Sequence, residues 1–90
     1  MKPTIGRIVI YKLNEWDVQR VKEFGDHNGN YYVSLGQEFP LIIVRVWPDE
    51  YGTGVPGVNG QVILDGRERL WITSAKEGTE PGTWNWLERV

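Results

Sequence analysis

The side chains that most often perform acid–base or nucleophilic catalysis are few in this chain and poorly grouped. Its one histidine, His27, stands between Asp26 and Asn28 in a segment typical of an exposed turn. Ser34 and Ser74 have no neighbouring base in the sequence that would activate a hydroxyl as a nucleophile. This inventory predicts a protein that is not an enzyme.

Carboxylates and glycines could also build a reactive site, but their spacing here does not favour one. Asp49–Glu50 and the pair Asp65 and Glu68 could act on a glycoside if a cleft held two carboxyl groups about 5–10 Å apart. Neighbouring residues in turns usually point apart, so we interpret these acids as solvated loop charges. The segment Gly52–Gly57 lacks the Gly-Lys-Ser/Thr ending of a phosphate-binding loop. The chain has no cysteine, and we expect neither a metal nor a cofactor.

Aromatic residues are the feature with the most functional content. Five tryptophans in 90 residues exceed ordinary usage, which is about one per hundred residues. A core this small cannot enclose all of them, so we expect some rings at the surface, although each could instead be a structural ring that closes one end of a barrel. Indoles beside guanidinium groups, such as those of Arg45, Arg67 and Arg69, suit planar anionic ligands and protein hot spots alike. The predicted binding residues are Trp47, Tyr51, Arg67, Arg69, Trp71, Trp84 and Trp86.

The elements that must position these rings are mostly short strands separated by glycine and proline. The β-branched, apolar and alternating segments predict strands over Ile5–Lys12, Leu41–Trp47, Val58–Leu64, Leu70–Ser74 and Thr83–Glu88. Apolar residues on both faces of Leu41–Trp47 predict a central strand that is covered on both sides. Asn59–Gly60 could instead form a turn. Asn14–Phe24 predicts one short helix, with Asn14 as its N-cap and Gly25 as its end.

This order of elements predicts one domain over residues 1–90, mostly β. The expected fold is a small Src-homology-3-like barrel of about five strands with one short helix after the first strand. An oligonucleotide/oligosaccharide-binding barrel is the nearest competitor. The last strand should pack into the barrel or pair with the first.

Charge and the length of the apolar segments argue against two kinds of partner, duplex nucleic acid and membranes. The formal net charge is −2, and acids and bases are interleaved along the chain, so we expect no binding to duplex nucleic acid. The longest aliphatic run, Leu41–Val44, is too short to cross a bilayer. We expect no membrane association and a cytoplasmic location.

Both ends of the chain, and several positions between them, resemble a group of small proteins of bacteriophages and actinobacterial prophages. The resemblance is carried by Lys2–Tyr11, Phe39–Pro40, Val44–Trp47, Leu64–Gly66 and Pro81–Val90. The strongest motifs are Lys-Pro-Thr-x-Gly-Arg-Ile-Val at the start and Pro-Gly-Thr-Trp-x-Trp near the end. The chain departs from the group at Ile10, where histidine is common, and at Leu87, where proline is common. The resemblance implies a phage or prophage origin, hence a host-cell cytoplasm, and implies no activity.

These observations predict a non-catalytic binding module that acts on a host or phage protein. Exposed rings and the loop that carries Tyr51 would dock on that protein or build a homo-oligomer. The alternative is capture of a small anionic ligand, such as a nucleotide signal, in a pocket lined by aromatic and arginine side chains. Such a pocket could form between subunits.

Overall fold

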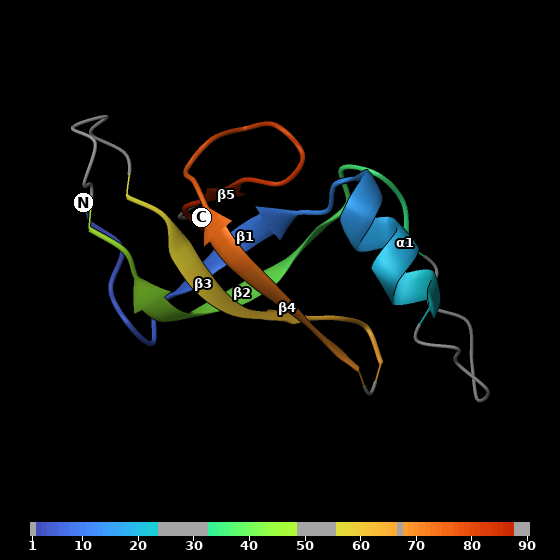
Figure 1. The fold of residues 1–90 in the computed structure, drawn as a ribbon, viewed down its shortest axis with the longest axis horizontal. Helices are drawn as coiled ribbons and strands as arrows, with labels where there is room; N and C mark the ends of the chain where they lie inside the picture. Colours follow the sequence, from blue (N-terminus) through green and yellow to red (C-terminus); the bar gives the residue numbers. More distant parts are fainter. Residues whose placement is uncertain (1, 24–32, 49–55, 67, 88–90) are drawn as a thin grey trace.

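A computed structural model of the chain describes residues 2–23, 33–48, 56–66 and 68–87. Its elements are β1 (Ile8–Lys12), α1 (Glu15–Glu23), β2 (Glu38–Val46), β3 (Val58–Ile63), β4 (Arg69–Ala75) and β5 (Trp84–Asn85). The strands form one antiparallel sheet in the order β4-β3-β2-β1-β5 (Figure 1). The predicted mostly β class, with five strands and one short helix after the first strand, is confirmed. None of the described helical residues form a segment long and apolar enough to span a bilayer.

The two ends of the sheet meet through the last strand. β5 pairs with β1 through Ile10↔Asn85 and Tyr11↔Trp84, which confirms the second of the two predicted placements of the last strand, pairing with the first. On its other side, Trp84 forms an isolated parallel bridge with Glu77, just after β4. The Trp84 N–H donates to the Lys76 carbonyl at 3.0 Å, and the Gly78 N–H donates to the Trp84 carbonyl at 2.9 Å.

The predicted barrel is therefore confirmed only in part. The sheet curves, but no continuous ladder joins β4 to β5 among the described strands, because β5 has two residues. The alternating pattern predicts a strand over Thr83–Glu88. It ends early because the Trp86 N–H donates to the Asn85 side-chain oxygen at 2.7 Å rather than to a neighbouring strand. The last of the predicted strand residues, Glu88, lies outside the described residues.

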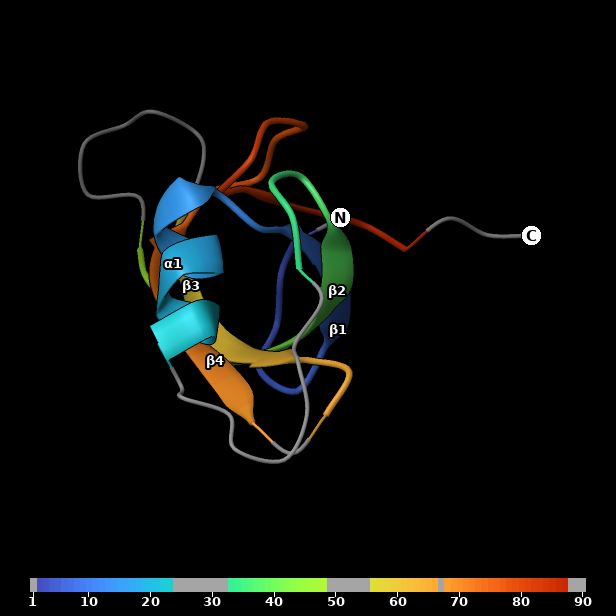
Figure 2. The same cartoon turned by 90° about the vertical axis from the view of Figure 1, so that its right-hand side faces the viewer.

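The core lies on one face of the sheet, the inner face. Alternate strand residues are buried there, and α1 adds Val21 to the same cluster. Its members from the sheet and the adjoining turns are Val9, Tyr11, Leu13, Phe39, Leu41, Ile43, Val58, Val62, Leu64, Leu70, Ile72, Ala75 and Trp84. Because α1 packs toward this interior, it leaves the other side of β1 and β2 uncovered; Figure 2 shows the helix on the opposite side of the molecule from these strands.

One face of β2 is therefore open, and the prediction that this strand is covered on both sides is wrong. Ile42 is half-buried, and Val44 is 45% exposed. The apolar run Leu41–Val44 reflects a buried inner face and an apolar outer face, rather than a strand between two layers.

The helix begins where the sequence predicts, at a reciprocal cap. The Asp17 N–H donates to the Asn14 side-chain oxygen at 2.8 Å, and the Asn14 N–H donates to the Asp17 carboxylate at 3.0 Å. The same carboxylate accepts the buried Tyr11 hydroxyl at 2.5 Å, which ties α1 to β1. Burial first, and then the bond to Asp17, raises the pKa of Tyr11 above its ordinary value. The predicted helix end at Phe24 and Gly25 lies outside the described residues.

Asn59 and Gly60 lie within β3 and do not form a turn. β-bulges between Ile43 and Arg45 and between Val58 and Gly60 distort the strands around them. A Cβ at Gly60 would collide with the carbonyl oxygen of Ile42. Glycine is needed here because two backbones approach closely inside the sheet.

Candidate binding face

The structure separates the predicted binding residues into surface and core. Trp47 and Trp71 are each 38% exposed, and Arg69 is exposed on β4. Trp86 is half-buried. Tyr51 and Arg67 lie outside the described residues.

Trp84 is a core residue, so its prediction as a surface binding ring is wrong. It is 1% exposed, and its indole N–H donates to the Ala75 carbonyl at 3.2 Å. The Trp86 ring meets it edge-on, with centroids 5.0 Å apart and an interplanar angle of 87°. Pairing with Tyr11 turns the Trp84 side chain toward the interior, where it fills the space between β1 and the end of β4.

Trp47 is held in place by its neighbours. The guanidinium carbon of Arg45 lies 4.7 Å from its ring centroid, so the predicted pairing of this ring with an arginine is confirmed. The indole N–H donates to the Asn59 side-chain oxygen at 2.9 Å, and the same oxygen accepts the Ser74 N–H at 2.7 Å. Asn59 thus connects the exposed ring to β3 and to the end of β4. A ring fixed in this way loses little conformational entropy when another molecule covers it.

Backbone irregularities create this corner of the sheet. The bulge after Ile43 brings Arg45 opposite Asn59. Ser74 adopts a positive φ of 52°, which is uncommon outside glycine. Its turned backbone presents the N–H that Asn59 accepts. Sequence pattern alone does not indicate either feature.

A row of outward side chains crosses four strands on the outer face. The register places Ile8 beside Ile42, Ile42 beside Gln61, and Gln61 beside Trp71. Directly paired residues share a face of an antiparallel sheet, with Cβ atoms about 4.5–5.5 Å apart. Ile8 is 45% exposed, while Ile42 and Gln61 are half-buried. We call these residues, Ile8, Ile42, Gln61 and Trp71, the outer row.

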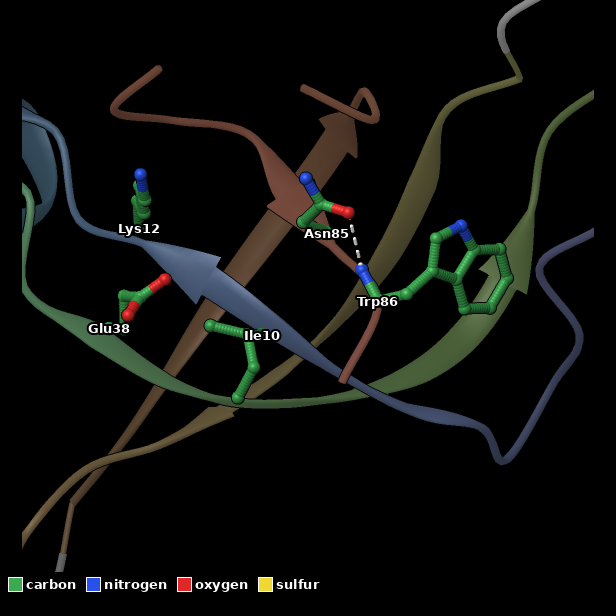
Figure 3. Close-up of a pocket in the computed structure, with 5 residues that line it drawn as sticks. All are labelled: Ile10, Lys12, Glu38, Asn85 and Trp86. Atoms are coloured by element: carbon green, nitrogen blue, oxygen red, sulfur yellow. Dashed lines mark hydrogen bonds between the residues drawn. The ribbon is translucent and has the colours of Figure 1, made fainter. Parts of the chain in front are cut away.

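A pocket of about 420 Å³ lies on the same outer face beside β5. Its lining residues are Ile10, Lys12, Glu38, Asn85 and Trp86 (Figure 3). The Lys12 ammonium donates to the Thr79 carbonyl at 2.8 Å, and both ends of the Asn85 amide are hydrogen-bonded to the backbone. The carboxylate of Glu38 also lines the space. An anion would meet a negative charge there, and the lysine is already bonded to a carbonyl.

The sequence did not indicate one further contact, between Arg7 and Trp86. The guanidinium carbon of Arg7 lies 5.5 Å from the centroid of the Trp86 ring. The two residues stand near opposite ends of the chain, and only the pairing of β5 with β1 brings them together. The predicted pairing of the first and last strands was the available signal.

The remaining catalytic candidates lie only partly within the described residues. Within the described ranges, no set of three or more histidine, cysteine, aspartate or glutamate residues could hold a metal ion. Asp65 and Glu68 are exposed. His27, Asp49 and Glu50 lie outside the described residues.

No protein-family model, curated protein sequence or solved structure matches the chain. The function is therefore inferred from the geometry of the outer face.

Proposed function

We propose that this protein is a non-catalytic binding module that docks on another protein through the outer face of its sheet. The outer row carries the proposal: Ile8 and Ile42 lie side by side on adjacent strands, and Trp71 follows beyond Gln61, with Ile8 and Trp71 both exposed. Contiguous exposed apolar surface on a small domain marks an interaction site. In line with its resemblance to phage proteins, the partner is a host or phage protein.

The corner at Trp47 supports a protein partner in a second way. Binding energy in protein interfaces concentrates in tryptophan, tyrosine and arginine side chains that are held in place before binding. Trp47 and Arg45 form such a pair, stacked at 4.7 Å and fixed through Asn59. Trp71 lies on β4, and the N–H of Ser74 in the same strand donates to the same Asn59.

Capture of a small anion is the weaker alternative. The stacked arginines favour it, but the pocket beside β5 is lined by Glu38 and by a lysine that already donates to a carbonyl. A thermal-shift screen with nucleotides separates the two functions. Ligand at about a hundred times its dissociation constant would add about 2.7 kcal/mol to the free energy of unfolding, and we expect no such shift.

The direct test compares two tryptophan variants. A partner is first identified by affinity capture from host cells, and its dissociation constant is then measured with purified components. We expect Trp71→Ala to weaken binding about 30-fold, the effect of a hot spot worth about 2 kcal/mol. Trp16→Ala is the matched control, since Trp16 is 78% exposed on α1 and should leave binding unchanged. Equal effects of both variants, or none from Trp71→Ala, would refute the proposal.

A further inference from the structure

The outward side chains of β2 form a pattern that complements itself. Along the outer face this strand presents Glu38, then Pro40 and Ile42, and then Arg45 after the bulge. An acid stands at one end, a base at the other, and apolar side chains lie between them. The alternate residues Phe39, Leu41 and Ile43 are buried on the inner face.

We propose that a second copy of this chain docks on this face, about a two-fold axis that passes between Pro40 and Ile42. The inference rests on the proposed function and names one occupant of its outer face: of the host or phage proteins that could dock there, it is a second copy of this chain. A two-fold interface uses the same patch twice, so each residue meets its counterpart in reverse order. Glu38 of one copy then faces Arg45 of the other, and the contact forms twice.

The apolar centre of the contact is wider than one strand. In register, Ile8 lies beside Ile42 and Ile10 beside Pro40, so β1 adds two isoleucines to the patch. Two sheets that pack face to face lie about 10 Å apart and bury such side chains between them. The exposed Val44, beside the bulge, extends the apolar surface toward Arg45.

Both charged groups are placed for this contact before it forms. The Arg45 guanidinium lies over the Trp47 ring at 4.7 Å, and a stacked guanidinium still presents N–H donors at its edge to a carboxylate. The cation paired with Glu38 in register, Lys12, donates to the backbone carbonyl of Thr79. Glu38 is exposed and lines the open pocket, so its carboxylate can be reached from outside.

The test is a charge exchange followed by sedimentation velocity over a range of protein concentrations. Wild type should sediment as a dimer at high concentration. Glu38→Arg and Arg45→Glu should each raise the dimer dissociation constant by about tenfold or more, because each places like charges together at two symmetric positions. The double variant Glu38→Arg/Arg45→Glu should return it to within about threefold of wild type. Glu23→Arg and Lys22→Glu, matched reversals at exposed positions on α1, should leave it unchanged.

Each outcome is decisive. The inference would be overturned by a wild type that stays monomeric at several hundred micromolar, about a hundred times a typical micromolar dissociation constant. A dimer that is insensitive to the single reversals, or a double variant that remains a monomer, would also overturn it. Circular dichroism of each variant separates loss of assembly from loss of folding, and rescue in the double variant requires a folded chain. A monomeric wild type whose partner binding is still lost in Trp71→Ala would overturn the dimer and leave the proposed function standing.

Discussion

The buried hydroxyl of Tyr11 offers a direct test of how the helix is attached to the sheet. Tyr11→Phe removes one oxygen and keeps the ring, so packing changes little. The substitution leaves the Asp17 carboxylate, which is 4% exposed, with the Asn14 N–H at 3.0 Å as its remaining hydrogen-bond donor in the cap. A hydrogen bond to a charged group contributes about 1.5–3 kcal/mol. We therefore expect the free energy of unfolding to fall by about 2 kcal/mol.

That loss is large for a domain of this size. It corresponds to a fall in melting temperature of about 8–16 °C, since 1 kcal/mol shifts a small domain by about 4–8 °C. Urea denaturation followed by circular dichroism measures it, with Asp17→Asn and the double variant completing a double-mutant cycle. A loss below about 0.5 kcal/mol in Tyr11→Phe, or a coupling energy near zero, would refute the argument that this bond anchors α1.

The same residue predicts how stability depends on alkaline pH. Burial and the bond to Asp17 raise the pKa of Tyr11 in the folded chain above its ordinary value of 10.0. The folded chain thus keeps the phenolic proton where the unfolded chain has lost it. Stability from this group is complete below pH 10 and falls by about 1.4 kcal/mol per pH unit above it. Tyr11→Phe should lack this contribution, so the gap between the two proteins should narrow as pH rises. A constant gap up to pH 11.5 would contradict the prediction.

Three further substitutions test the bulged corner of the sheet by urea denaturation. Gly60→Ala should lower the free energy of unfolding by at least about 2 kcal/mol, because its Cβ would meet the Ile42 carbonyl oxygen and lie 2.7 Å from a Leu41 methyl carbon. A loss under about 0.5 kcal/mol would show that the strands can separate freely. Asn59→Ala should cost about 1 kcal/mol, since it removes the acceptor of two N–H groups, whereas Asn59→Asp keeps an acceptor and should be near neutral. Ser74→Gly should stabilise the chain by up to about 1 kcal/mol and Ser74→Val should destabilise it by about 1–2 kcal/mol, since the φ of Ser74 is 52°. Stability changes of the same sign in both variants would argue against backbone strain.

Much of the fold could be predicted because local signals agreed with tertiary structure. The N-cap at Asn14 and the alternating strands lie close to their predicted positions. The last strand could not be bounded from its pattern, because it is ended by a hydrogen bond from the Trp86 N–H to the side chain of Asn85. The apolar run at Leu41–Val44 indicated two buried faces, whereas the structure leaves one face open.

The sequence predicted the types of side chain on the binding face better than it predicted which residues lie there. The sequence indicated that some tryptophans must be exposed, and Trp16, Trp47 and Trp71 are. It could not tell that Trp84 is enclosed, because that depends on the register that sets Trp84 opposite the buried Tyr11. Of the outer row, only Trp71 was predicted. Its residues come from four strands, and only the register places them side by side.

The way β5 joins the sheet also governs the order in which the fold can assemble. β2, β3 and β4 follow one another along the chain and pair with their sequence neighbours, so they can form from local contacts. The pairing of Tyr11 with Trp84 must close most of the polypeptide into a loop, which is slow because of its entropy. During synthesis, the interior beside Tyr11 therefore stays exposed to water until Trp84 leaves the ribosome and covers it.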